Sequence, residues 1–157
     1  MSRRRLRGES GAAIVEFALI LPFLCLMIVL MLDFGRAFNY WIDTTHLASE
    51  GARLAAVDRV PTGSGSLQAY VRSKADTSEL RDGGSRWIDA PLAVCVNPGP
   101  GDEVGDPVEV TVTTTYHFLP IGNLPIPGLD DIDDMQIHGS ATMRREVVAD
   151  NVSSGCG

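Results

Sequence analysis

The feature that most constrains this chain is a long apolar segment near its N-terminus. Residues 17–32 contain no charged side chain, residues 12–15 extend the apolar stretch, and Glu16 alone interrupts it. A helix over residues 12–32 would span about 31 Å, which matches the hydrocarbon core of a bilayer. The segment 12–32 is therefore predicted to be a transmembrane helix. The carboxylate of Glu16 then needs an explanation, because a charge inside a membrane-spanning segment is energetically unfavourable.

The charges that flank this segment predict its orientation. Asp33 follows the segment, and four arginines precede it, namely Arg3, Arg4, Arg5 and Arg7. By the positive-inside rule, the N-terminus lies in the cytoplasm and residues from about 35 onward lie outside. A secretory signal fits less well, because the apolar stretch is too long and no A-x-A site follows it. Two adjacent arginines also suggest a twin-arginine signal, but within this basic cluster a topology signal is the simpler interpretation.

The overall charge argues against nucleic acid as a partner. The net charge is −7, and residues 1–11 carry +3, so residues 12–157 carry −10. Protein contacts to phosphate depend on lysine and arginine, which this acidic portion offers sparingly. We therefore expect membrane lipid among the partners, and no nucleic acid.

Three cysteines divide between the predicted membrane segment and the outer portion. Cys25 lies in the apolar span, whereas Cys95 and Cys156 lie in the part expected outside, where the environment is oxidising. A Cys95–Cys156 disulfide would close a loop of about 60 residues and stabilise the fold by about 4 kcal/mol in the chain-entropy model. The alternative is two free or intermolecular thiols.

The helical pattern continues beyond the membrane segment. Residues 33–58 lack proline, and small or aromatic residues recur at steps of three or four. One helical face is formed by Phe34, Phe38, Trp41, Thr45, Ala48, Ala52 and Ala55, and its alanine-rich outer end suits packing against a sheet or another helix. One helix is therefore expected over residues 12–58, ended by Pro61 and the glycine–serine run that follows. A further helical stretch is predicted over residues 67–80.

The period changes to two in the second half of the chain. Residues 92–96, 108–118 and 135–144 are predicted strands, and a loop rich in proline, glycine and aspartate covers 119–134. A sheet with one apolar face must be covered, and the outer half of the long helix is available for this. The predicted fold class is α+β, with a long N-terminal transmembrane and stalk helix packed on a small three-stranded antiparallel sheet. The expected parts are a basic leader (1–11), a transmembrane helix (12–32), an amphipathic helix extension (33–60) and an extracytoplasmic β-rich domain (61–157).

The N-terminal residues resemble a known family. Gly11 follows a short basic leader, Glu16 stands five residues later, Phe17 comes next, and a proline lies early in the apolar span. The quartet Asp33-Phe34-Gly35-Arg36 and a stalk rich in small residues follow. In this combination residues 8–57 resemble TadE-like proteins, which are pseudopilins of the Tad (Flp-type) branch of the type IV pilus family. Residues 108–146 resemble the family's C-terminal part much less specifically.

The resemblance implies roles for particular residues. A prepilin peptidase would cut between Gly11 and Ala12, and residues 8–11, which are poor helix formers, are expected to be extended there. Glu16 would attract the new amino group of a neighbouring subunit and, together with Phe17, set the register between subunits. Pro22 would loosen the helix. Glu16 could instead reach the headgroups from the end of the span, and Pro22 could be a tolerated kink.

These observations define an expected function. The resemblance implies a minor pilin or pseudopilin-like assembly component of a Tad/Flp-type pilus, anchored in the cell membrane by one pass. Its expected partners are a prepilin peptidase, other pilin or pseudopilin subunits and the Tad secretion machinery. The alternative is a single-pass, signal-anchored extracytoplasmic binding domain that is neither processed nor assembled into a filament.

Other chemistry has weaker support in the sequence. No catalytic constellation is visible, so the chain is not expected to be an enzyme or to need a cofactor. Asp130, Asp131, Asp133 and Asp134 lack the spacing of a calcium loop. His117 and His138 lie on predicted neighbouring strands, but no third metal ligand stands out, and surface histidines are the expected outcome. Tyr40 and Trp41 are expected to form an aromatic belt above the membrane.

Overall fold

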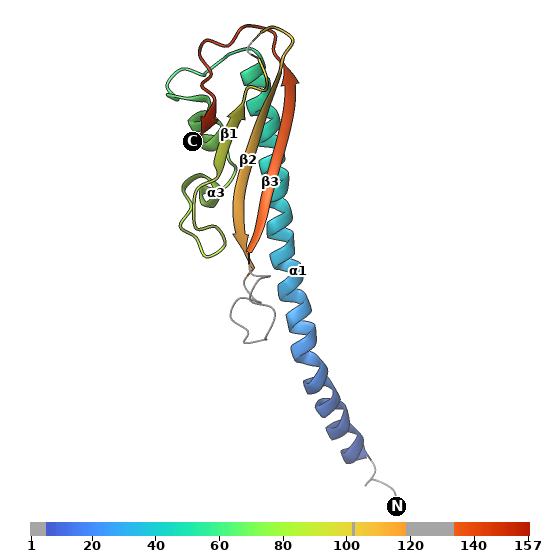
Figure 1. Cartoon of the computed structure of the whole chain (residues 1–157). Helices are drawn as coiled ribbons and strands as arrows, with labels where there is room; N and C mark the ends of the chain where they lie inside the picture. The colour runs from blue at the N-terminus through green and yellow to red at the C-terminus, as the bar shows by residue number, and fades with distance from the viewer. Residues whose placement is uncertain (1–5, 102, 119–133) are drawn as a thin grey trace, which may run out of the picture. The chain divides into compact units, whose positions relative to one another are not determined.

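The computed structural model describes residues 6–101, 103–118 and 134–157, with side chains described from residue 11 onward. The chain divides into two compact units, Met1–Gly35 and Arg36–Gly157. Helix α1 (Leu6–Ala56) belongs to both units, and the remaining helices and strands belong to the second (Figure 1). The fold is α+β, as predicted, with a long N-terminal apolar helix and a small antiparallel sheet.

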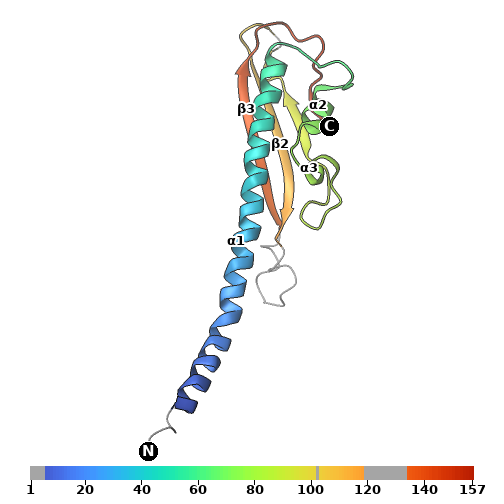
Figure 2. The ribbon, with the colours of Figure 1, turned by 180° about the vertical axis from the view of Figure 1, so that it is seen from behind.

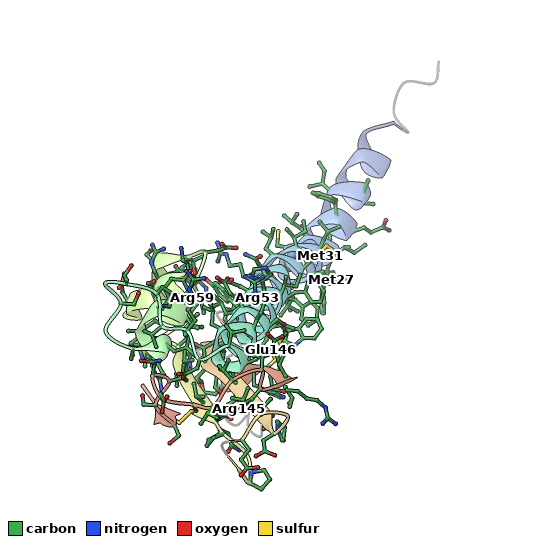
Figure 3. All side chains as sticks on the ribbon, turned by 90° about the horizontal axis from the view of Figure 1, so that it is seen from above. Met27, Met31, Arg53, Arg59, Arg145 and Glu146 are labelled. Carbon is green, nitrogen blue, oxygen red and sulfur yellow. A yellow bond between two sulfur atoms is a disulfide. The ribbon has the colours of Figure 1, made fainter. Side chains whose placement is uncertain are left out.

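The first unit consists of the N-terminal part of α1. The side chains of residues 11–32 are exposed, apart from the half-buried Leu30, and Met27 and Met31 are labelled among them in Figure 3. By length and composition, α1 could cross a membrane. The helix begins at Leu6, so residues 8–11 are helical and not extended as expected. Adding residues to an existing helix is easier than starting one, which overrides the weak propensities of this stretch.

Helix α1 ends at Ala56, two residues earlier than predicted, in a defined cap. Asp58 adopts a left-handed conformation with φ of 49°. Its amide donates to the Ala55 carbonyl, and the Arg59 amide donates to the Leu54 carbonyl. These two bonds form a Schellman motif, in which a left-handed residue satisfies the last carbonyls of the helix.

The predicted helical stretch over 67–80 is two short helices. Helix α2 (Leu67–Ser73) is capped by the Ser66 hydroxyl and α3 (Ser78–Asp82) by the Thr77 hydroxyl. Between them the chain turns at Ala75, which is fully buried, and the Asp76 amide donates to the carboxylate of Asp43 on α1. A tertiary contact thus divides a segment that its local pattern makes continuous.

The sheet contains four strands where three were predicted. Strands β1 (Ala93–Asn97), β2 (Pro107–His117), β3 (Asp134–Arg144) and β4 (Gly155–Cys156) are antiparallel in the order β3-β2-β1-β4. Alternate residues of β2 point inward, as expected from its pattern. Strand β4 has only two residues, too few to give a period. The predicted loop over 119–134 lies outside the described residues except for Asp134, which opens β3.

The sheet packs on the second half of α1 (Figure 2). A Cβ atom on Gly139 would lie 2.6 Å from the backbone of Thr44, so β3 touches the helix backbone directly. A Cβ atom on Gly51 would lie 3.0 Å from the Val110 side chain. Ala48, Ala52 and Ala55 are buried beside Gly51, so the small residues of the stalk allow close helix–sheet packing, as predicted.

The helical face noted in the sequence is not the buried face in its N-terminal part. Phe34, Phe38, Trp41 and Thr45 are exposed, and the buried positions are Ala37, Tyr40, Thr44 and Leu47. The burial stripe is displaced by about one residue, or roughly 100° around the helix. Gly139 of β3 reaches the helix backbone at Thr44, and Tyr40 packs on Tyr116 of β2, so contact with the sheet sets the buried side of the helix.

Candidate functional site: the N-terminal segment of α1

The predicted cleavage position lies on an accessible helix surface. Gly11 and Ala12 are exposed, and a Cβ atom on Gly11 would meet no atom within 4 Å. A protease that reads extended backbone would need this part of α1 to unwind locally. Gly8, Gly11 and Ser10 make unwinding easier, because glycine and serine have low helix propensity.

Glu16 and Ala12 are brought onto one face of the helix. Residues four apart in an α-helix lie above one another, with Cβ atoms about 5–6 Å apart. Glu16 and Phe17 are both exposed. If the chain began at Ala12, Glu16 would lie near the positive end of the helix dipole and beside the chain's own amino group. The geometry therefore suits a carboxylate that can pair with an amine from the same chain or from a neighbour.

Pro22 and Cys25 lie in the same exposed segment. Helix α1 is continuous through Pro22, so the loosening expected there stays a prediction. The Cys25 thiol is free and exposed. Neither residue is brought together with a second chemically active side chain by the fold of the described residues.

Polar contacts fix the part of α1 that follows Gly35 to the rest of the second unit. The Tyr40 hydroxyl donates to the Glu79 carboxylate at the start of α3, and the Tyr40 ring packs on Tyr116. Burial, then the bond to Glu79, raises the pKa of Tyr40 above its usual value. Burial also raises the pKa of Asp43, against the effect of the hydrogen bond from the Asp76 amide. Tyr40 is thus a buried anchor and not part of an interfacial belt, whereas Trp41 is half-exposed.

These contacts were not predicted from the sequence. Tyr40 and Asp43 lie 39 and 33 residues from Glu79 and Asp76, their respective partners, and each is ordinary on a helix surface. A signal was available in the spacing of Ala37, Tyr40 and Thr44, which continues the stripe of Ala48, Ala52 and Ala55 toward the N-terminus at steps of three or four.

The two histidines of the sheet do not form a joint site. His117 pairs with Asp134 across the β2–β3 ladder, whereas His138 pairs with Thr113. Four residues of β2 therefore separate the two positions, a distance of about 13 Å along a strand. Among the described residues no cluster of three His, Cys, Asp or Glu side chains could hold a metal ion. Asp130, Asp131 and Asp133 lie outside the described residues.

The C-terminal segment is fastened to the second unit at several points. Cys95 and Cys156 form a disulfide between paired positions of β1 and β4. The Gln68 amide donates to the carbonyls of Ser153 and Gly155. Asp58 accepts hydrogen bonds from the backbone amides of residues 150–152 and from the Asn151 side chain. These contacts are structural and offer no reactive group.

Comparison with known proteins gives one match. Residues 11–53 match the model of the family described as TadE-like protein. No curated protein and no solved structure matches the chain. The match begins at the glycine of the predicted cleavage position and includes Glu16, Phe17 and most of the stalk. Residues 11–53 are therefore similar to the TadE-like family, in agreement with the resemblance carried by Gly11, Glu16 and Phe17.

Proposed function

We propose that this chain is a minor pilin or pseudopilin-like component of a Tad/Flp-type pilus, matured by a prepilin peptidase. The TadE-like segment indicates a component associated with a Tad pilus, and α1 supplies its single hydrophobic helix. The observation that carries the proposal is the position of Glu16. It is the one charged residue in an exposed apolar stretch of 21 residues or so, and it lies one helical turn from Ala12.

The proposed maturation explains the position of that carboxylate. Hydrolysis of the Gly11–Ala12 bond removes four arginines and creates an amino group at Ala12. An ammonium group beside Glu16 offsets the unfavourable transfer of the carboxylate into a helix bundle. Because Ala12 and Glu16 share a helix face, a neighbouring helix can bring its own amine to Glu16 only in a narrow range of axial positions. The pair would thus set the register between subunits, with Phe17 packing beside it.

The chain acts in this proposal as a substrate and a subunit, not as an enzyme. Its N-terminus lies in the cytoplasm before cleavage, and the unit Arg36–Gly157 lies on the outer side of the membrane. The large second unit favours a minor or initiating subunit, since the major pilins of such systems are very short. The prepilin peptidase, other pilin or pseudopilin subunits and the Tad secretion machinery are the proposed partners.

Processing is tested by intact mass and N-terminal sequencing of the membrane-extracted chain from cells that carry the peptidase. The expected N-terminus is Ala12. Gly11→Leu should leave the chain uncut, whereas Gly35→Leu should be cut normally. Gly35 is a matched control, because it is also a glycine of α1 with no atom near the position of a Cβ. A wild-type chain that keeps its Met1 end would overturn the proposal.

Assembly is tested separately with Glu16→Gln, which keeps the size of the side chain and removes its charge. We expect the chain to be cleaved normally. Chemical crosslinks between the first helical turns of neighbouring subunits should be lost, and the number of pili should fall strongly. Glu50→Gln, which changes a carboxylate in the outer part of the same helix, should have little effect. Normal pilus numbers with Glu16→Gln would exclude the register role while leaving processing in place.

The alternative function is an anchored binding domain that is never cut. It is favoured by the extent of the second unit beyond the TadE-like match, and by a cavity of about 360 Å³ beside β2. This function predicts an intact leader and no response to Glu16→Gln. The two experiments above therefore separate it from the pilus function.

A further inference from the structure

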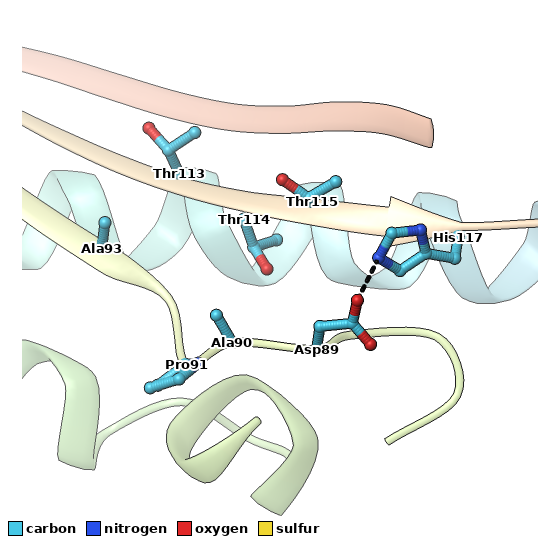
Figure 4. Close-up of a pocket in the computed structure, with 8 residues that line it drawn as sticks. All are labelled: Asp89, Ala90, Pro91, Ala93, Thr113, Thr114, Thr115 and His117. Atoms are coloured by element: carbon cyan, nitrogen blue, oxygen red, sulfur yellow. Dashed lines mark ion pairs between the residues drawn. The ribbon is translucent and has the colours of Figure 1, made fainter. Parts of the chain in front are cut away.

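A cavity lies just before the start of β1, where β2 extends past its pairing with β1 and keeps only β3 as a neighbouring strand. It has a volume of about 360 Å³ (Figure 4), and its walls are formed by Asp89, Ala90, Pro91, Ala93, Thr113, Thr114, Thr115 and His117. In the β1–β2 register Ala93 pairs with Thr113, so Pro91 would lie opposite Thr115. Proline has no amide hydrogen and cannot extend the ladder. The segment before β1 therefore lies beside β2 without a regular ladder of backbone hydrogen bonds to it.

His117 fastens this segment at its far end. Its backbone amide donates to the Trp87 carbonyl at 2.9 Å. Its ring contacts two carboxylates on different segments, with Nε2 3.1 Å from Asp89 and Nδ1 2.5 Å from Asp134 on β3. The His117 side chain is 24% exposed, whereas those of Asp89 and Asp134 are 78% and 61% exposed. Figure 4 shows the Asp89 contact spanning from β2 to the loop at the edge of the cavity.

The protonation state of the ring decides how many of these contacts can form. A carboxylate only accepts hydrogen bonds, so both ring nitrogens must donate if both contacts are to be hydrogen bonds. An imidazolium ring donates from both nitrogens, whereas neutral imidazole donates from one and presents a lone pair from the other. In the neutral ring, the nitrogen without a proton would face a carboxylate oxygen, and that contact would be repulsive.

A buried hydroxyl provides a second reason for the segment to open. The Thr114 hydroxyl is buried and lines the cavity, with no hydrogen-bond partner among the described residues. The Thr114 side chain is turned toward the loop in Figure 4. A buried polar group without a partner is unfavourable, and water entering an opened cavity would satisfy it. The closed arrangement therefore depends on the contacts that hold the segment down.

The charged groups around His117 make the balance sensitive to its proton. Asp89 faces it from the loop and Asp134 from β3. A cation contacts the same segment, because Arg36 on α1 stacks on the Trp87 ring at 4.4 Å. Tyr40 and Glu79 form their own pair on the inner side of the sheet. With the ring protonated, one positive charge lies between two negative charges; with the ring neutral, only the two negative charges remain.

We propose that His117 is a pH-sensitive latch that holds residues 87–91 on the end of β2, where they partly cover the cavity, while its ring is protonated. Loss of the proton leaves the shorter contact with Asp134 and breaks the contact with Asp89. The segment then opens to water. Histidine is the side chain that ordinarily changes charge between pH 5 and 8, so a change in the pH around the protein would work the latch.

The test uses NMR spectroscopy of the full chain in detergent micelles, with histidine labelled with ¹⁵N. The chain has three histidines, so each ring can be assigned by substitution. At pH 5.5 we expect both ring N–H groups of His117 to be observed. By pH 8, the Nε2 proton should be lost. Over the same pH range, the hydrogen-exchange protection factors of the amides at 87–89 and 117 should fall about two- to fivefold, the size of one partly exposed ion contact.

Two substitutions complete the test. His117→Gln should abolish the pH dependence of protection at 87–89 and leave protection low at every pH. Asp89→Ala should do the same while His117 still titrates. His138→Gln is the matched control, because His138 is exposed on the neighbouring strand and pairs with Thr113, and it should change nothing at these amides. Protection factors that stay constant from pH 5.5 to 8 in the wild-type chain, or that change equally with His117→Gln, would overturn the proposal.

Discussion

The two parts of α1 contain similar apolar residues, but these residues have opposite surroundings. Leu24, in the first unit, is 50% exposed, whereas Leu47, six turns or so further along the same helix, is 1% exposed under the sheet. The second part is specified by contacts inside the chain. Apolar residues of the first part find their favourable surroundings outside the chain, in lipid or against other helices. The residues with the clearest functional pattern, Gly11, Glu16 and Phe17, lie in that first part.

Because of this difference, the N-terminal motif reports on contacts outside the chain, whereas the fold of the second unit reports on contacts within it. In the second unit, a substitution changes the free energy of unfolding through packing, hydrogen bonds and the disulfide. In residues 11–32, the fold of the described chain places few demands on each side chain, yet these residues lie within the match to the TadE-like family. Under the proposed function, their constraints come from the membrane, the peptidase and neighbouring subunits. Substitutions can separate these two sources.

The largest effect on the second unit should come from removing its disulfide. Cys95 and Cys156 are 61 residues apart, and in the chain-entropy model a loop of this length stabilises the fold by about 4 kcal/mol. Cys95→Ser/Cys156→Ser should therefore lower the free energy of unfolding by about that amount in urea titrations followed by tryptophan fluorescence. Cys25→Ser, in the first unit, should leave the transition where it was. A loss that is equal for the two variants would contradict the division between the units.

A pair of leucine substitutions tests the comparison within one helix. Leu47→Ala should reduce the free energy of unfolding of the second unit by about 3 kcal/mol, because it leaves a cavity in a closed core. Leu24→Ala removes the same atoms from an exposed position and should change that free energy by less than about 0.5 kcal/mol. Urea unfolding of the detergent-solubilised chain measures both. Equal effects would mean that the first part of α1 is packed by the chain after all.

Backbone contact between β3 and α1 gives the next smaller effect. Gly139→Ala would place a methyl group 2.6 Å from the Thr44 backbone, and neither element can move freely. We expect a loss of about 2 kcal/mol, typical of overpacking in a core. Ser140→Ala, one residue along and on the exposed side of β3, should be nearly neutral. A neutral Gly139→Ala in thermal unfolding would show that the helix and the sheet can separate slightly at this point.

Much of the second unit could be predicted from periodicity, and the failures have physical causes. Strand β2 alternates over eleven residues, and each inward position is apolar or threonine, so its face is unambiguous. Between residues 34 and 45 the apolar periodicity follows Phe34, Phe38 and Trp41, which are exposed, whereas the buried stripe of Ala37, Tyr40 and Thr44 is set by contact with the sheet. Strand β4 is too short to show a period, and its position follows from the disulfide with β1.

The functional residues also divide into those that could be predicted from the sequence and those that could not. Gly11, Ala12, Glu16 and Phe17 could be named from the sequence because their spacing is a linear pattern read by other molecules. The contacts of Tyr40 with Glu79 and of His117 with Asp89 could not, because each joins residues brought together by the fold alone. Local patterns report local periods and linear motifs, whereas pairs distant in sequence depend on register and on the turns between elements.

The smallest predicted effect concerns the hydrogen bonds by which the Asp58 carboxylate holds the backbone amides of residues 150–152, here called the Asp58 clip. Burial alone would raise the pKa of Asp58, but the hydrogen bonds from residues 150–152 outweigh it and lower the pKa below the usual value. A carboxylate whose pKa is lower in the folded state contributes stability above its unfolded pKa of about 4, and this is lost as the pH falls through the folded value. Asp58→Asn should therefore cost about 1 kcal/mol at pH 7, because the residue is only half-buried and its hydrogen bonds are partly screened by solvent. The asparagine still tolerates the left-handed backbone at this position.

The pH dependence distinguishes this clip from a general effect of charge. In urea titrations between pH 7 and pH 3, the difference between wild type and Asp58→Asn should be constant down to about pH 5 and shrink toward zero below the unfolded pKa. Asp150→Asn is the control, because Asp150 contributes its backbone amide to the clip, and the substitution leaves that amide in place. It should follow the wild-type curve. If the difference for Asp58→Asn persisted unchanged at pH 3, its cause would lie in the turn conformation at the end of α1 and not in the charge that holds the C-terminal segment.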